Sequence, residues 1–222
     1  MPSGEKSRIV VLHLTKYSDS SAVVHTIDSL HGRKSYFVRG LKSGRKSTAM
    51  FHPLNILDII SYDSPKSSLS SLKEWTPVAS FDSIRSNIYK STIAMFISEV
   101  IFRSIRNEDA DSSLSDWLCG AVARLESTDG PVANFHLWFL ASFCTRMGFR
   151  PDGAIEPQGI FNPWEEDLFL LIMKSTFEET MSLELSSSRR NAFSKKMLQY
   201  LSYHIGCEIN ARSLDVLHEV LA

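Results

Sequence analysis

Residues 17–51 read YSDSSAVVHTIDSLHGRKSYFVRGLKSGRKSTAMF, and this stretch decides the fold of the first part of the chain. Residues 22–28 and 34–41 are rich in β-branched, aliphatic and aromatic residues, and a Gly-bearing turn at 30–33 separates them. Two such runs around a short turn are typical of a β-hairpin. Residues 42–48 (KSGRKST) are too polar and too rich in Gly and Ser for regular structure. We therefore predict a hairpin that leads into a basic loop.

The positive charge of the chain is concentrated in this stretch. No Asp or Glu interrupts its six cations, which are Arg33, Lys34, Arg39, Lys42, Arg45 and Lys46. Residues 1–80 hold eleven Lys and Arg against six Asp and Glu, a net charge of +5, whereas residues 81–222 hold thirteen against nineteen, a net of −6. A block of cations on a β scaffold favours a polyanionic partner. The uneven charge suggests two modules with different partners.

Three further strands are predicted around the hairpin, at residues 8–15, 54–62 and 69–78, because these runs are aliphatic and bounded by turn residues. Five short strands within about eighty residues indicate a small closed barrel, and a five-stranded OB-like fold suits this length. From residue 82 onward the apolar residues recur at three- and four-residue spacing, which predicts helices. The fold class is therefore α+β, with an OB-like barrel in residues 1–80 and an all-α helical domain in residues 81–222.

Five helices and a short last one are expected in the second part. Residues 82–105 and 114–125 are amphipathic, and residues 131–147 are apolar almost all round, as in the central helix of a bundle. Asn162, Pro163 and Glu165 have the order of a helix N-terminus with a capping box. Residues 188–205 and 213–221 complete the set, and Gly148 and Gly206 are expected to end helices.

The composition indicates a globular protein of a reducing compartment. Hydrophobic residues make up 43% and charged residues 22%, enough for a core. The three cysteines are far apart, and none forms a CxxC pair. We find no signal-like N-terminus and no apolar run long enough to span a bilayer. The expected location is cytoplasmic, with no membrane partner.

The order of these parts resembles the RecO family of DNA repair proteins, which are recombination mediators. The resemblance rests on the opening strand followed by YSD at 17–19, on FVRGLKSGRKS at 37–47, and on FDSIR at 81–85, where the helical part begins. YHIG at 203–206 with RSL at 212–214 is similar to the last helices of the family. The similarity covers nearly the whole chain and depends on layout and length rather than on one motif.

The resemblance implies a protein without catalytic activity that binds single- and double-stranded DNA and anneals complementary strands. It also implies a role in loading recombinase on single strands coated with SSB, with RecR and the acidic C-terminal tail of SSB as partners. Many family members carry a four-cysteine zinc site in the helical part, but residues 149–164 contain no cysteine. A structural zinc site needs four such ligands. We therefore predict no metal and no cofactor, and expect Ile155, Ile160, Phe161 and Trp164 to hold this segment by packing.

The predicted DNA-binding residues are the six cations together with Tyr36, since OB-folds combine a cationic groove with aromatic stacking. Phe37, Phe51 and Tyr17 lie near them in the sequence, and one of Tyr36 and Phe37 must face inward. A solvated loop beside ordinary core aromatics is the alternative from charge alone. A protein-interaction adaptor, whose basic loop docks an acidic partner, is the alternative function. A hydrolase or nuclease is a third alternative.

Several other patterns are weaker. GLKSGRKS at 40–47 lacks the spacing of a nucleotide-binding phosphate loop, because Arg45 separates Gly44 from Lys46. The acidic run 165–167 fits the first turn of a helix without any catalytic role. His13 and His25 are expected as cross-strand neighbours rather than as metal ligands. The cations Arg189, Arg190, Lys195 and Lys196 could extend the DNA surface, meet an acidic tail, or form a solvated helix face.

Overall fold

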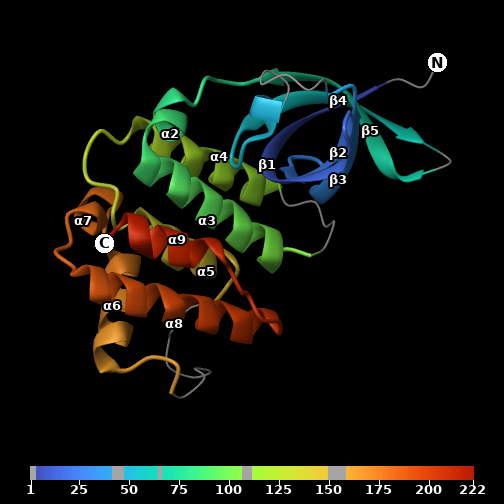
Figure 1. Cartoon of the computed structure of the whole chain (residues 1–222). Helices are drawn as coiled ribbons and strands as arrows, with labels where there is room; N and C mark the ends of the chain where they lie inside the picture. The colour runs from blue at the N-terminus through green and yellow to red at the C-terminus, as the bar shows by residue number, and fades with distance from the viewer. Residues whose placement is uncertain (1–3, 42–47, 65–66, 107–111, 150–158) are drawn as a thin grey trace. The chain divides into compact units, whose positions relative to one another are not determined.

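The first part of the chain forms a closed five-stranded barrel (Figure 1). The structure is a computed structural model that describes residues 4–41, 48–64, 67–106, 112–149 and 159–222. The strands are β1 (Glu5–Ser18), β2 (Ser21–Asp28), β3 (Gly32–Arg39), β4 (Ile56–Ser64) and β5 (Ser67–Pro77), and a short 3-10 turn, η1 (Ala49–Phe51), precedes β4. They pair in the order β1-β2-β3-β5-β4, and the barrel closes between β4 and β1. All pairs are antiparallel except β3 with β5. The predicted OB-like barrel is confirmed.

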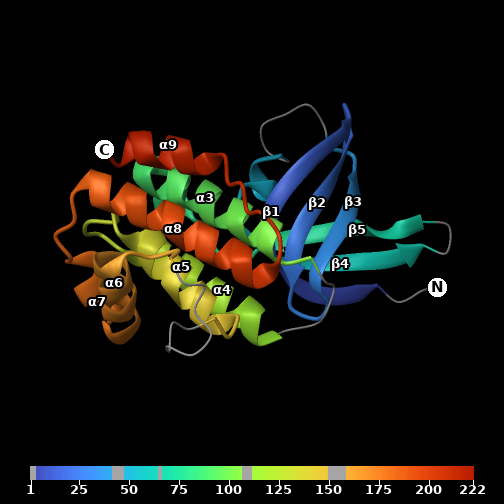
Figure 2. The same cartoon turned by 90° about the horizontal axis from the view of Figure 1, so that it is seen from below.

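The long strand β1 belongs to both halves of the barrel. Its first part pairs with β4 from Glu5 to Val10, and its later part pairs with β2 from Ile9 to Ser18. An irregularity between Val11 and His13 shifts the register and re-aims the side chains that follow. Figure 2 shows β1 curving along the barrel beside β2. The bend lets one strand close the sheet on itself.

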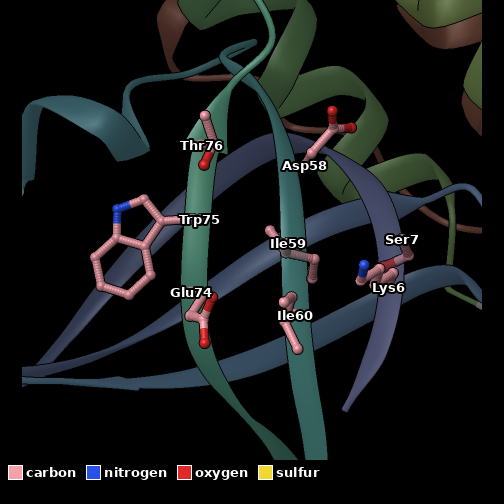
Figure 3. A pocket seen from close by; sticks show the side chains of 8 residues that line it. All are labelled: Lys6, Ser7, Asp58, Ile59, Ile60, Glu74, Trp75 and Thr76. Atoms are coloured by element: carbon pink, nitrogen blue, oxygen red, sulfur yellow. The ribbon is translucent and has the colours of Figure 1, made fainter.

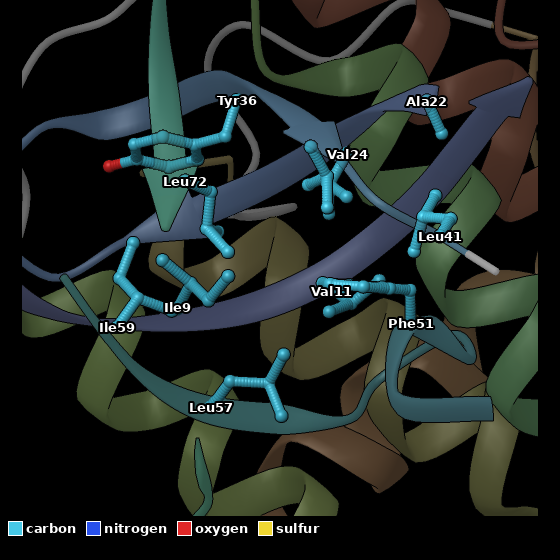
Figure 4. Packing of buried hydrophobic residues seen from close by; sticks show 11 residues of the cluster. Ile9, Val11, Ala22, Val24, Tyr36, Leu41, Phe51, Leu57, Ile59 and Leu72 are labelled. Carbon is cyan, nitrogen blue, oxygen red and sulfur yellow. The ribbon is translucent and has the colours of Figure 1, made fainter. Parts of the chain in front are cut away.

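Alternating side chains from all five strands fill the barrel (Figure 4). The buried residues of this core are Ile9, Val11, Ala22, Val24, Tyr36, Val38, Leu41, Phe51, Leu57, Ile59 and Leu72. At about 25 cal/mol per Å² of apolar surface removed from water, such a core is the main source of barrel stability. Phe51 of η1 lies 5.3 Å from the ring of Trp75 on β5, so η1 covers one part of the core.

The helices are α2 (Asp82–Ser86), α3 (Ile88–Ser104), α4 (Ser112–Ser127), α5 (Phe135–Arg146), α6 (Pro163–Lys174), α7 (Phe177–Met181), α8 (Ser187–Ile205) and α9 (Ser213–Val220). The chain divides into two compact units, residues 1–82 with 105–126 and residues 83–104 with 127–222. The helix α4 thus groups with the barrel by contacts, whereas our sequence-based boundary places it in the helical domain; that boundary stays a prediction.

The second unit is built around α5, which contacts α3, α6, α7 and α8. The helix is buried along most of its length, as its apolar sequence predicts. The α9 helix lies along α3 in both views (Figures 1 and 2). The carboxylate of Glu99 on α3 accepts hydrogen bonds from the Ser213 backbone N–H at 2.9 Å and from its hydroxyl at 2.6 Å. This contact caps the first turn of α9 from a helix more than a hundred residues earlier in the chain.

The helix ends follow the capping signals in the sequence, with two exceptions. Asn162 and Glu165 form the predicted capping box at α6, and Gly206 ends α8 with a φ of 73°. The predicted single helix 82–105 is instead two helices, because the Asn87 side chain accepts from the Tyr89 and Lys90 N–H groups and so starts α3. A second capping box, Thr176 with Glu179, starts α7, which the sequence analysis does not predict.

Candidate nucleic-acid interface

Strand β3 divides the predicted binding residues between two faces of the barrel. Tyr36 and Val38 point into the core, while Phe37 is half-buried on the outer face and Arg39 is exposed. The alternation follows from the two-residue period of a strand. Arg33 lies on the outer face with Phe37 and Arg39. Lys34 is two residues from Tyr36 and therefore belongs to the same side of the strand as Tyr36. The remaining three predicted residues, Lys42, Arg45 and Lys46, lie outside the described residues.

Tyr36 is a core residue, not a surface one. Its hydroxyl donates to the buried carboxylate of Asp28 at 2.5 Å, and that carboxylate also accepts from the Ser7 hydroxyl at 2.6 Å and from the Leu30 and His31 N–H groups. Burial, followed by the contact with Asp28, raises the pKa of Tyr36. With its side chain 0% exposed, Tyr36 cannot stack on a base in this structure. We therefore leave it out of the proposed interface.

The two cations at the start of β3 are partly engaged within the protein. Arg33 is half-buried, and this burial lowers its pKa to about 10, so the guanidinium remains charged at neutral pH. The Lys34 ammonium lies 5.4 Å from the centroid of the Tyr36 ring. Its charge also contributes to a lowered pKa of Asp63, after the hydrogen bond that the Ser70 hydroxyl donates to that carboxylate. Neither cation is as accessible to a ligand as Arg39.

Arg39 lies at the end of β3 among aromatic rings. Its guanidinium carbon is 5.2 Å from the centroid of Phe37, and the ring of Tyr17 meets Phe37 edge-on at 5.5 Å. Tyr17 comes from the end of β1, and it reaches Phe37 because Val23 of β2 pairs with Thr15 on one side and with Phe37 on the other. Cation and rings therefore share one surface made of three strands.

His13 and His25 lie further along the same three strands. Their rings stack at 5.9 Å, which confirms the predicted cross-strand contact. The two ring nitrogens of His25 lie 3.0 Å from the Thr15 hydroxyl and 2.8 Å from the Ser35 hydroxyl. Burial, and then the charges of Arg33 and His13, lowers the pKa of His25 to about 4. His25 is therefore neutral at physiological pH.

Among the hollows that the described residues form on the barrel unit, two bear on the choice of interface, and one of these touches this surface. A hollow of about 580 Å³ is lined by His13, Leu14, Thr48, Ala49, Phe51, His52 and Pro53. The other, of about 420 Å³, lies across β1, β4 and β5 (Figure 3). It presents one ammonium, Lys6, beside the carboxylates of Asp58 and Glu74. The mixed charge of this hollow does not suit a polyanion. The outer face of β1, β2 and β3 with Tyr17, Phe37 and Arg39, here called the β1–β3 face, is therefore the better candidate for a nucleic-acid interface.

Two of the candidate residues in the helical unit, Arg190 and Glu165, have structural roles. Arg190 donates to the backbone carbonyls of Leu185 at 2.5 Å and Leu221 at 2.8 Å, so this guanidinium joins the start of α8 to the end of α9. Arg189 lies 5.6 Å from the ring of Trp164. Glu165 is buried and accepts from the Asn162 N–H at 2.9 Å, as a cap does. Lys195 is exposed and Lys196 is half-buried.

The segment in which zinc is not expected has aromatic contacts at both described ends. Phe149 stacks on His204 at 4.8 Å, and Phe161 packs against Phe169 and Tyr200. Ile160 is buried, while Ile155 lies outside the described residues. Among the residues that the structure describes, no group of three or more His, Cys, Asp or Glu side chains is placed to hold a metal ion. Likewise, none of the described helices is long and apolar enough to cross a membrane.

Sequence reasoning missed the neighbours that decide which cations are accessible. Lys34 interacts electrostatically with Asp63, and the Thr15 and Ser35 hydroxyls orient His25. The two-residue period of each strand is visible in the sequence. It could have predicted that residues 13, 15 and 17 of one strand and residues 35, 37 and 39 of another lie on one face, with their rings together. The position of Asp63 depends on the closure of the barrel through β5, for which the sequence carries no local signal.

A closed five-stranded barrel followed by helices places the chain among proteins with an OB-like fold. Two family models match the chain, Recombination protein O N terminal over residues 1–81 and Recombination protein O C terminal over residues 85–154. The chain belongs to the RecO family of DNA repair and recombination proteins.

Three relatives named DNA repair protein RecO illustrate the similarity. The protein of Flavobacterium psychrophilum is 33% identical over 98% of this chain and 99% of its own length. The protein of Flavobacterium johnsoniae is 30% identical over the same shares of the two chains. The protein of Porphyromonas gingivalis is 29% identical over 90% of this chain and 91% of its own length. The likeness thus spans both the barrel and the helical part.

Proposed function

We propose that this protein is a DNA-binding recombination mediator without catalytic activity. It binds single- and double-stranded DNA, anneals complementary strands, and helps to load recombinase on single strands coated with SSB. RecR and the acidic C-terminal tail of SSB are its proposed protein partners, and the nucleoid is its proposed location. Membership of the RecO family supports the DNA repair role, and the run of cations from Arg33 to Lys46 supports the binding of DNA.

The observation that carries the proposal is the run of cations along and after β3. Arg33, Lys34 and Arg39 lie on this strand, and Lys42, Arg45 and Lys46 follow in the sequence with no acidic residue among them. Cations placed against phosphates release counterions, and this release gives DNA affinity that falls steeply with salt. The aromatic rings beside Arg39 add a surface on which unpaired bases can stack.

The test is fluorescence anisotropy with labelled single and double strands over a salt series, without ATP or metal. The triple variant Lys42→Glu, Arg45→Glu, Lys46→Glu should bind duplex more weakly. If each lost cation removes one phosphate contact, the log–log salt slope should fall by about 2 to 3, since each contact contributes about 0.9. The annealing of complementary strands should slow in the same variant.

A matched control places the same three charge reversals on the helical unit, at the exposed residues Arg146, Lys174 and Arg212, none of which is a candidate for the DNA surface. This variant has the same net charge as the first, so a general effect of charge would weaken both equally. The proposal fails if the wild-type protein has no affinity for naked DNA at moderate salt, which would favour an adaptor that docks an acidic protein. Turnover of DNA with added metal would instead indicate a nuclease.

A further inference from the structure

The outer end of the β1–β3 face carries a large aromatic ring in solvent. Tyr17 is 74% exposed, although tyrosine is usually at least half-buried in a folded chain. Its ring is held by the edge-on contact with Phe37 at 5.5 Å, and it lies between the exposed residues Lys16 and Ser18. An exposed ring that is already oriented loses little freedom when a second flat group stacks on it.

The charges around this ring pair suit a nucleic-acid backbone. The guanidinium of Arg39, at the end of β3, lies 5.2 Å from the Phe37 centroid. Lys16 lies 3.4 Å from the fully exposed carboxylate of Asp19, and an exposed pair of this kind is weak enough to be exchanged for a phosphate. A ring pair with cations beside it is the combination by which single strands are bound.

The next row of side chains along these strands is aromatic. His13 lies two residues before Thr15 on β1, and His25 lies two residues after Val23 on β2. This row is therefore about 7 Å further along the strands, at 3.4 Å per residue. The Thr15 and Ser35 hydroxyls fix the orientation of the His25 ring. A neutral imidazole offers a flat stacking surface to a neighbouring base.

We infer that the Tyr17–Phe37 ring pair, with Arg39 beside it, is a stacking site for an unpaired base, and that it gives this protein a preference for single-stranded over double-stranded DNA. The inference rests on the proposed DNA binding and adds the residues that discriminate between the two substrates. In a duplex the faces of the bases are covered by their neighbours in the stack, so only a single strand can place a base against Tyr17. Phosphate contacts, by contrast, are available to both substrates.

The experiment compares wild type with Tyr17→Ala in the full chain, using a labelled oligothymidine strand and a duplex of the same length. Stacking of one base is worth about 1–3 kcal/mol, so the variant should bind the single strand about 5- to 150-fold more weakly. Binding to the duplex should change by less than about twofold, because the residue carries no charge. Tyr17→Phe keeps the ring and should retain wild-type preference.

The control is Tyr203→Ala, which removes a tyrosine of similar exposure from α8 in the helical unit and should leave both affinities unchanged. A single strand of abasic sites separates stacking from charge, since the Tyr17→Ala variant and wild type should bind it equally. Equal losses on single strand and duplex, or no loss on either, would overturn the inference while the DNA binding of the wild type stands. If the wild type binds neither substrate, the proposed function itself fails.

Discussion

The buried histidine of α5 makes the helical unit sensitive to acid. His136 is 1% exposed. Its ring packs edge-on against the ring of Phe96, with 6.1 Å between the two centroids. Neither ring nitrogen makes a well-formed hydrogen bond within the described residues. Burial lowers the pKa of His136 to about 3, and the charges of His218 and Arg190 act in the same direction. The contact with the Ala133 backbone raises the pKa of His136, but it is the smallest of these effects. The ring is therefore neutral in the folded protein at any pH above about 3.

The pH dependence follows from the difference between the folded and unfolded pKa values. The unfolded chain takes up a proton on this residue as the pH falls through 6.5, while the folded chain does so only near 3. Between these values the unfolded state binds more protons, so stability is full above pH 6.5 and falls as the solution is acidified. For these two pKa values, the loss between pH 7.5 and pH 5 is about 2 kcal/mol.

The perturbation is His136→Leu, which replaces the imidazole with an apolar side chain of similar size. Urea unfolding followed by far-UV circular dichroism at pH 7.5 and pH 5 gives the free energy of unfolding of each protein. His25, His204 and His218, whose pKa values are also lowered by burial, weaken both proteins in acid. The variant should therefore still lose stability, but about 2 kcal/mol less than wild type.

The same variant should not be less stable at pH 7.5, because it removes two buried polar atoms that cost about 1–3 kcal/mol each when they lack partners. His52→Leu, at an exposed position on the barrel, serves as the control and should leave the acid response unchanged. If His136→Leu and wild type lose the same free energy between the two pH values, the account of this residue is wrong.

Two further predictions concern hydrogen bonds that hold each unit together. Tyr36→Phe removes the hydroxyl that donates to the buried Asp28 carboxylate, so thermal unfolding should show a loss of about 1–3 kcal/mol, with unchanged affinity for DNA; reduced affinity at unchanged stability would restore Tyr36 to the interface. Glu99→Ala removes the cap of α9, at a cost of about 0.5–2 kcal/mol, and should speed amide exchange over residues 213–220. Glu219→Ala, at the exposed far end of α9, is its control, and equal exchange in the two variants would contradict the capping role.

Local patterns in the sequence predict the elements well because their physical cause is local. The two-residue period of residues 36–39 places Tyr36 and Val38 opposite Phe37 and Arg39, as the structure confirms. The sequence at Asn162–Glu165 predicts the start of α6 because both capping partners lie within four residues. Asn87 breaks the predicted helix 82–105 by the same chemistry, but its polar side chain sits between two apolar helical runs and is easily overlooked.

Contacts between distant parts of the chain could not be predicted in this way. The parallel pairing of β3 with β5 brings Tyr36 opposite Ser70, and nothing near either residue specifies the other. The choice of the inward ring in β3 depends on Asp28, whose buried carboxylate receives the Tyr36 hydroxyl. The two-residue period of a strand allows either Tyr36 or Phe37 to face the core. Arg190 shows the same limit, because its partner at Leu221 lies thirty-one residues away.

These contacts change how the six cations should be counted. Of the three on β3, Arg33 is half-buried, Lys34 interacts with Asp63, and only Arg39 is exposed. The strand therefore offers rings and a single accessible guanidinium, and most of the charge for a polyanion must come from residues 42–46. Base stacking and phosphate attraction should then be separable by mutation: Tyr17→Ala should alter the preference between single strand and duplex without changing the salt slope. Reversing Lys42, Arg45 and Lys46 should lower the salt slope on both substrates and leave the preference in place.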